Sequence, residues 1–233
     1  MLSASDVITI DGLFNDWDNV ATFASDIAGD GSSLDFAELR ITNDDQFLFL
    51  LLEFHGSETL LQDNNDIHLY IDTDNNPATG LGVNGLGADL EWCFGCRNGI
   101  YHKTSGDSVI LQNAITLRNA PVVTATKFEV AISRFSEMFT AGNGSPPNTI
   151  RLFLQESEAG GDLLPDIPMQ HYYIIDSTSV APPEPLPIVR ADTASVRLMT
   201  YNVLWGGLTD TARQQHFQRI ITALQPEIMA FQE

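Results

Sequence analysis

The chain of 233 residues has little positive charge and no long hydrophobic segment. Eleven Lys and Arg residues stand against 31 Asp and Glu residues, which gives a formal net charge of -20. Nucleic-acid binding depends largely on basic side chains that displace counterions from phosphates, so this balance argues against it. Apolar runs such as residues 47–52 are far shorter than the roughly 18 to 20 residues of a membrane helix. We therefore expect no membrane span.

The acidic charge is concentrated in the first part of the chain. Residues 1–178 carry 26 acidic and 7 basic residues, whereas residues 179–233 carry 5 and 4. The first part is therefore a poor surface for nucleic acid. Two explanations of the acidity stay open, namely solubility in salty surroundings and a surface that calcium partly neutralises.

Cysteine is scarce, with only Cys93 and Cys96 in the whole chain. The Trp92-Cys-Phe-Gly-Cys segment superficially resembles a thioredoxin-like redox site. Such a site places its first cysteine at a helix N-terminus, whereas Phe-Gly here has the character of a hairpin tip between strands. No further Cys or His pair stands at a spacing suited to zinc. A local disulfide or two free thiols are the alternatives.

The first five residues lack the basic start and apolar stretch of a signal peptide. This abrupt start fits a mature or trimmed N-terminus. An extracellular or cell-surface location is then inferred from the type of domain that follows, and not from a targeting signal in the sequence.

The first 178 residues have the pattern of an all-β sandwich, because short apolar runs alternate with Gly, Asn and Asp turns. Turn residues at 43–46 predict a hairpin over residues 37–54. One short helix is expected after Ser133, with Phe135, Met138 and Phe139 on its buried face. The predicted strands are residues 7–10, 37–42, 47–54, 66–72, 89–94, 99–103, 108–111, 122–126, 127–132, 149–156 and 171–175.

The character of the sequence changes after a proline-rich stretch at residues 181–187. Each proline removes a backbone donor and fixes φ, so this stretch predicts a semi-rigid spacer. Beyond it, residues 196–203 and 228–231 read as strands and residues 210–224 as a helix, an order that implies parallel strands. The predicted domains are a β-sandwich at 1–178, a linker at 179–195 and a β-α-β fragment of an α/β domain at 196–233.

Two polar residues end the predicted strands of the last segment, Asn202 in Met-Thr-Tyr-Asn-Val and Glu233 in Ala-Phe-Gln-Glu. Parallel strands present their C-terminal ends at one edge of a sheet, so these side chains are expected to point at one site. A carboxylate and an amide suit a hydrated Mg²⁺ and a neighbouring phosphate oxygen.

Residues 197–233 resemble the start of the endonuclease/exonuclease/phosphatase family, through the Thr-Tyr-Asn-Val strand, the Leu-Gln-Pro-Glu-Ile bend and the Phe-Gln-Glu end. The resemblance implies that Asn202 positions the phosphate and that Glu233 binds the catalytic Mg²⁺, which activates water and stabilises the leaving oxygen. Family members also use a His and further Asp and Asn residues that this chain does not reach. We therefore expect an inactive fragment of a Mg²⁺-dependent phosphoric ester hydrolase.

The parent enzyme implied by this resemblance is a nuclease or related phosphodiesterase, with a phospholipid or sugar-phosphate esterase as the alternative. Nucleic acid or another phosphodiester would then bind only through the missing catalytic domain. The competing interpretation is a β-α-β segment whose Asn and Glu have no shared role.

Oxygen-bearing side chains occupy alternate positions in the loop that begins at Asp72, where Asp74 and Asn76 are the third and fifth residues. Such spacing can converge on Ca²⁺. The loop is not an EF-hand, because Pro77 replaces the required glycine and Val83 stands where a bidentate Glu would be. The alternative is that Asp and Asn serve only as turn formers. Further ligands for a calcium site could come from Asp89, Asp63 or Asp66.

Three segments together resemble the family 9 carbohydrate-binding-module-like sandwiches, which are related to the DOMON-like fold. They are Ile10-Asp-Gly with Asp16-Trp17, Ile71-Asp-Thr-Asp, and residues 129–133. The resemblance covers roughly residues 6–176 and implies a jelly-roll-like sandwich of two antiparallel sheets that often binds sugars and structural calcium. The family's sugar-stacking aromatics do not map onto particular positions here.

Two of the three tryptophans are singled out, one as a core residue and one as a ligand-binding candidate. Trp17 is expected to pack beneath the first turn. Trp92 would offer a sugar platform only if it faces outward. Our interpretation is an accessory module that binds a polysaccharide or cell-surface glycan for a secreted phosphodiesterase, and the alternative is a calcium-stabilised scaffolding module with no phosphoesterase role.

Overall fold

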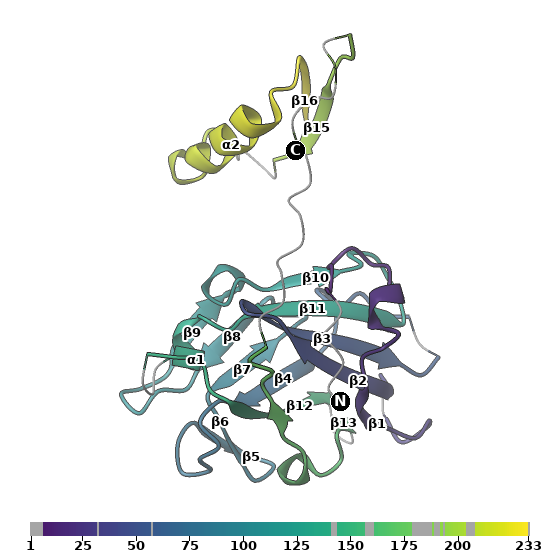
Figure 1. Ribbon diagram of the computed structural model, residues 1–233, viewed down its shortest axis with the longest axis vertical. Helices are drawn as coiled ribbons and strands as arrows, with labels where there is room; N and C mark the ends of the chain where they lie inside the picture. Colours follow the sequence, from purple (N-terminus) through teal and green to yellow (C-terminus); the bar gives the residue numbers. More distant parts are fainter. Residues whose placement is uncertain are drawn as a thin grey trace. The chain divides into compact units, whose positions relative to one another are not determined.

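A computed structural model describes residues 7–31, 33–56, 58–140, 144–156, 161–178, 188, 192, 194–203 and 208–232. The chain divides into two compact units, Met1–Pro182 and Pro183–Glu233. The described part is mainly β, with antiparallel sheets and few helices (Figure 1). Each unit is considered by itself.

The first sheet of unit 1 has five antiparallel strands. The hairpin predicted over residues 37–54 forms its centre, and seven residues of β11 pair with β3 in register. In spatial order the strands are β1 (Thr22–Ser25), β2 (Phe36–Asn43), β3 (Phe47–Phe54), β11 (Lys127–Ser133) and β10 (Arg118–Ala120).

The second sheet has seven strands, also antiparallel. Its central strand β4 pairs with β12 on one side and with β7 on the other. In order the strands are β13 (Leu163–Leu164), β12 (Thr149–Glu156), β4 (Ile67–Asp72), β7 (Leu90–Cys93), β8 (Asn98–Tyr101) and β9 (Ser108–Leu111), and β14 (Tyr173–Ile174) pairs with β12.

One hydrophobic core joins the two sheets. Alternate residues of β3, at positions 48, 50 and 52, are fully buried in it, and so are Ile67, Leu69 and Ile71 of β4. Burying each such side chain contributes about 1.5–3 kcal/mol. The main cluster draws on residues from Ala24 to Ile175, so it spans almost all of unit 1.

A small hairpin covers the opposite face of the second sheet. Its strands β5 (Leu81–Val83) and β6 (Leu86–Ala88) bring Leu86 and Ala88 into a cluster with Tyr70 and Phe153. The rings of Tyr70 and Phe153 stack with centroids 4.7 Å apart. The hairpin also packs against the loop after β4, because a Cβ at Gly87 would overlap the carbonyl oxygens of Thr79 and Asn76. It therefore fixes the loop that holds the candidate site.

The helices of unit 1 are short. Helix α1 (Glu137–Thr140) buries Met138 and Phe139 as predicted, but Phe135 precedes the helix and is 61% exposed, so its predicted place on the buried face is wrong. Ser133 accepts a hydrogen bond from the backbone N–H of residue 135. The remaining helical turns are the 3₁₀ segments η1 (Asn15–Trp17), η2 (Gln112–Ala114) and η3 (Pro168–Gln170).

Two predicted strands are absent from the structure. Residues 7–10 have no regular structure, and residues 122–126 form bends with a single bridge from Ala125 to Thr59. The strand beside β11 is instead β10, which ends directly before Pro121, a residue that cannot donate to a ladder. Val122 and Val123 are exposed, so the high β-propensity of valine was not sufficient to place them in a strand.

Unit 2 contains two strands and one helix. Strands β15 (Leu198–Asn202) and β16 (Ile228–Gln232) pair in parallel, and α2 (Thr211–Leu224) lies between them in the sequence. Phe217 of α2 is buried against Tyr201, with ring centroids 5.4 Å apart. All residues of β16 are exposed, including apolar side chains at positions 228, 229 and 231.

Candidate metal centre

Three aspartates meet where β4 and β7 lie side by side. Asp72 ends β4, Asp74 lies in the loop that follows, and Asp89 directly precedes β7. The backbone N–H of Asp89 donates to the carbonyl of Ile71, which joins the two chain segments at this point. Each aspartate offers a carboxylate oxygen, and these oxygens lie within 4.8 Å of one another. Oxygens around one Ca²⁺, each 2.3–2.6 Å from the ion, have such separations.

The cluster is buried on one side and open on the other. Asp72 is 1% exposed and Asp89 is 8% exposed, whereas Asp74 is exposed. Among the described residues no hydrogen-bond partner reaches the buried Oδ1 of Asp72. A buried carboxylate oxygen without a donor is costly, and a cation at this position would satisfy it.

The pKa values of the two buried carboxyl groups, Asp72 and Asp89, reflect burial and the charges beside them. Burial raises the pKa of Asp72 to about 6, and the charges of Asp74 and Asp89 also raise it. Hydrogen bonds from the backbone N–H groups of Asn75 and Asn76 act in the opposite direction and lower it. Burial also raises the pKa of Asp89, with a further contribution from the charge of Asp74. Hydrogen bonds from Thr73 oppose that rise. Ionising Asp72 and Asp89 is therefore unfavourable without a compensating positive charge.

Hydrogen bonds hold the carboxylates in place. The Oδ2 atom of Asp89 accepts from the backbone N–H of Thr73 at 2.8 Å and from its hydroxyl at 2.5 Å. Asp74 Oδ1 accepts from the backbone N–H of Asn76 at 2.9 Å, and the Thr79 hydroxyl donates to Asp74 Oδ2 at the same distance. These bonds orient the remaining oxygens, as partners behind metal ligands commonly do.

The predicted calcium residues are placed as follows. Asp72 and Asp74 come together, and Asp89 joins them, whereas Asp63 pairs with Arg97 at 3.8 Å. Asn76 uses its side-chain oxygen to accept from the backbone N–H of Ala78 at 3.1 Å, which is a turn-forming bond.

A cavity of about 330 Å³ adjoins the cluster. Asp74 belongs to both, since it lines the cavity together with Thr73 and Asn75 of the same loop. The opposite wall comes from α1 and from the segment before β12. Its residues are Met138, Phe139, Ser145, Pro147, Asn148 and Thr149.

A second acidic region was missed by the sequence reasoning because its members are far apart in the chain. Two groups of three share Asp30, and burial raises the pKa of Asp162, with a contribution from Asp26. Both oxygens of Asp162 accept backbone N–H bonds, from residues 36 and 163. The members are Asp26, Asp30, Asp35, Asp162 and Asp166.

A third polar group links β4, β7 and the end of β8. Glu91 contacts Nδ1 of His68 at 3.0 Å and Nε2 of His102 at 3.3 Å. The remaining ring nitrogens lie near Asp66 and Asp107. Both ring nitrogens of each histidine therefore lie near a carboxylate.

The cysteines form a disulfide across the turn between β7 and β8, with Cα atoms 5.2 Å apart. The local-disulfide interpretation is therefore confirmed, and neither sulfur is a free thiol for zinc or redox chemistry.

Trp17 and Trp92 both point inward. Trp17 is buried, as predicted, and its Nε1 donates to Glu129 at 3.3 Å. Trp92 is 2% exposed and belongs to the main core, so it does not provide an outward sugar platform. The condition on which Trp92 was a ligand-binding candidate is not met.

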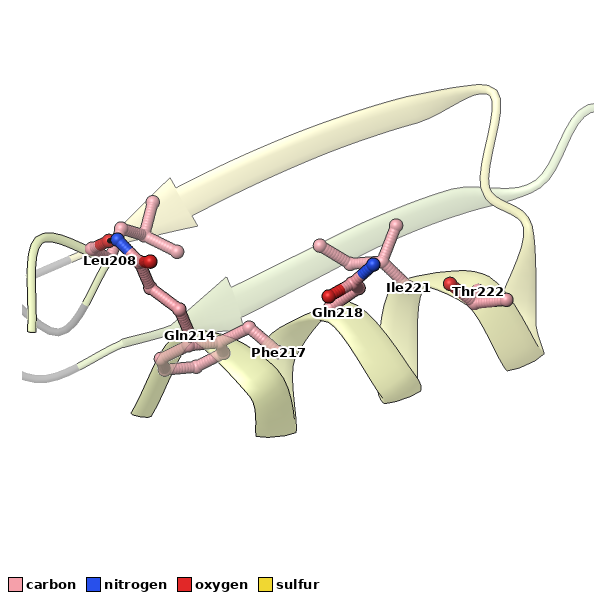
Figure 2. Close-up of a pocket in the computed structure, with 6 residues that line it drawn as sticks. All are labelled: Leu208, Gln214, Phe217, Gln218, Ile221 and Thr222. Atoms are coloured by element: carbon pink, nitrogen blue, oxygen red, sulfur yellow. Dashed lines mark hydrogen bonds between the residues drawn. The ribbon is translucent and has the colours of Figure 1, made fainter. Parts of the chain in front are cut away.

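In unit 2, Asn202 is exposed at the end of β15 and lies beside Gln232 in the parallel register. Glu233 lies outside the described residues. A second cavity of about 330 Å³ lies along α2, and Figure 2 shows the side chains of the helix that line it, with Leu208 joining them from the loop before the helix. Its described lining offers apolar, amide and hydroxyl groups but no carboxylate or imidazole. The lining residues are Leu208, Gln214, Phe217, Gln218, Ile221 and Thr222.

No protein-family model matches this sequence, and no curated protein sequence matches it significantly. Among the described residues no helix is both long and apolar enough to cross a membrane. The chemistry of the aspartate cluster is therefore inferred from its geometry alone.

Proposed function

We propose that unit 1 is a calcium-stabilised binding module with a jelly-roll-like β-sandwich fold. The observation that carries the proposal is the buried Oδ1 of Asp72, which has no described hydrogen-bond partner and lies in a group with Asp74 and Asp89. An all-oxygen set on a loop suits Ca²⁺, which accepts irregular geometry, better than Mg²⁺, which demands a near-ideal octahedron. The ion would also offset part of the acidic charge.

The test compares thermal unfolding of the chain in 1 mM CaCl₂, in MgCl₂ and in EDTA. A ligand that binds only the folded state at about 100 times its Kd adds about 2.7 kcal/mol of stability. At about 2–4 °C per kcal/mol, we expect Ca²⁺ to raise Tm by roughly 5–11 °C, and Mg²⁺ to raise it less. Superimposable curves in calcium and EDTA would reject the proposal.

Variants sharpen this test. Asp72→Asn should abolish the calcium-dependent shift and raise Tm in EDTA, because it removes a buried charge that the apo protein must accommodate. Asp63→Asn is the matched control, since Asp63 is an exposed aspartate near Arg97. It should keep the full shift. Loss of the shift in both variants would point to a nonspecific effect of charge.

The binding role that we propose is attachment to a polysaccharide or cell-surface glycan, outside the cell. The disulfide between Cys93 and Cys96 supports this location, because such bonds persist in oxidising compartments. The acidic surface supports a neutral ligand over a phosphate backbone. Isothermal titration against plant, algal and bacterial oligosaccharides tests the role, and flat titrations across the panel would remove it.

A second proposal concerns unit 2, which we assign to the start of a Mg²⁺-dependent phosphoesterase domain. The parallel register that sets Asn202 beside Gln232 supports it, because the residue after Gln232 is Glu233. The exposed apolar residues of β16 also suit a strand that a larger domain covers on both faces.

The enzymatic proposal is tested on a polypeptide that continues past Glu233 in the same reading frame. We expect Mg²⁺-dependent hydrolysis of DNA, RNA or bis(p-nitrophenyl) phosphate. Asn202→Ala and Glu233→Gln should each lower kcat by 10²-fold or more while leaving the Tm of unit 1 unchanged. A folded, extended protein inert on all three substrates would contradict this assignment without affecting the calcium proposal.

A further inference from the structure

The cavity beside the aspartate cluster shares one of its walls with the proposed calcium site. Asp74 contributes to both, and its neighbours Thr73 and Asn75 line the same cavity. Asn75 Nδ2 donates to the carbonyl of Thr149 at 2.7 Å, which ties the loop to the opposite wall. An ion held by the three aspartates would therefore lie at the edge of a formed cavity.

The three aspartates alone do not fill the coordination sphere of Ca²⁺. The ion takes six to eight oxygen ligands. Asp89 Oδ2 and both oxygens of Asp74 already accept hydrogen bonds from the loop, so the three carboxylates leave coordination positions of the ion open. Asp72 and Asp89 are buried and Asp74 is exposed, so the open positions fall on the side of Asp74.

The opposite wall suits a sugar. Pro147 is partly exposed and gives a small apolar surface, Asn148 and Thr149 offer hydrogen-bonding groups, and the buried side chains of Met138 and Phe139 close the base of the cavity. A volume of about 330 Å³ lies at the small end of ligand pockets, which fits one or two sugar units.

The charge of the site favours a neutral ligand. Three carboxylates and one Ca²⁺ keep one net negative charge, and residues 1–178 carry 26 acidic against 7 basic residues. Phosphate, sulfate and uronate groups are disfavoured in this field. Hydroxyl oxygens of a neutral sugar are hard, uncharged ligands that Ca²⁺ accepts.

We propose that this cavity is the glycan site of the module, where two neighbouring hydroxyl groups of a neutral sugar complete the coordination of Ca²⁺ held by Asp72, Asp74 and Asp89. The inference rests on the proposed calcium site and names the ligand class of the binding module. Recognition then depends on calcium directly, and not only through fold stability.

The experiment is ¹H–¹⁵N NMR titration of the full chain with methyl mannoside, methyl fucoside and methyl galactoside, and with their deoxy analogues that lack one hydroxyl of the vicinal pair. We expect shifts at the backbone of Thr73, Asn75 and Asn148 in calcium with at least one parent sugar. Binding should weaken at least tenfold in EDTA and with the matching deoxy sugar.

Two variants separate this inference from the calcium proposal. Asn148→Trp fills the cavity without removing a carboxylate, so it should keep the calcium-dependent rise in Tm and lose sugar binding. Asn113→Trp, at an exposed position in η2, is the matched control and should keep both. A calcium-dependent Tm without any sugar-induced shift at the cavity overturns the glycan site alone. Absence of the Tm rise overturns the calcium proposal with it.

Discussion

Glu129 shows how strongly one buried acid can couple this fold to pH. Its side chain is fully buried and accepts from the backbone N–H of Gly12 at 2.7 Å and from Trp17 Nε1. Burial raises its pKa from 4.5 to about 6, these two donors oppose the rise, and the charges of Asp16 and Asp11 add to it. Glu129 thus links the N-terminal turn to β11, and burial disfavours its ionised form relative to its protonated form.

Glu129→Gln should therefore change the pH dependence of stability. Because the pKa is higher in the folded state, the stability from this group is fully present below about pH 4.5 and is lost as pH rises through about 6. The difference corresponds to about 2 kcal/mol. Urea unfolding at pH 4.5 and 7.5 can be followed by tryptophan fluorescence. The free energy of unfolding of wild type, relative to that of the variant, should be higher at pH 4.5 than at pH 7.5 by about this amount. The exposed Glu58→Gln is the control, and parallel pH profiles for wild type and Glu129→Gln would contradict the assignment.

Single residues also show what the sequence could predict about the site. Asp72 and Asp74 were found from local spacing, because both lie in one loop. Asp89 was only one of several options, since its place beside Asp72 depends on the pairing of β4 with β7. The five-aspartate region was missed because residues 26–35 and 162–166 come together only in the folded chain.

At the scale of elements, the long apolar strands were predictable, whereas several short strands were not. The predicted strands at residues 47–54, 108–111 and 149–156 have the bounds that the structure gives. Strands β1, β5, β6, β10 and β13 were not predicted, because runs of two to four residues carry little periodicity and gain much of their structure from partners. The β5–β6 hairpin matters most, since it supports the loop of the candidate metal centre.

Gly87→Ala should disturb that loop from a distance. A Cβ at Gly87 would overlap the carbonyl oxygens of Thr79 and Asn76, and both belong to backbone rather than to movable side chains. We expect a loss of about 1–3 kcal/mol, as for other overpacked sites, and weaker calcium binding. Calorimetric titration with Ca²⁺ and thermal unfolding in EDTA measure the two effects.

Gly82→Ala is the matched control, because Gly82 pairs with Gly87 in the same hairpin and an added Cβ there meets nothing within 4 Å. It should leave Tm and calcium affinity close to wild type. Equal calcium affinities in the two variants would show that the hairpin does not support the loop.

At the scale of the whole chain, the two units should differ sharply in stability. Unit 1 buries complete strands between two sheets, whereas unit 2 has two paired strands, and β16 is exposed along its full length. A two-stranded sheet gains little stability by itself, and parallel strands normally require cover on both faces. We expect amides of β3, β4 and β12 to resist hydrogen exchange for hours, while those of β15, α2 and β16 exchange within minutes.

Removing residues 179–233 should also leave the Tm of the main transition unchanged. Protection in β16 equal to that in β3 would contradict this expectation, because β16 would then need a partner that covers its apolar side chains.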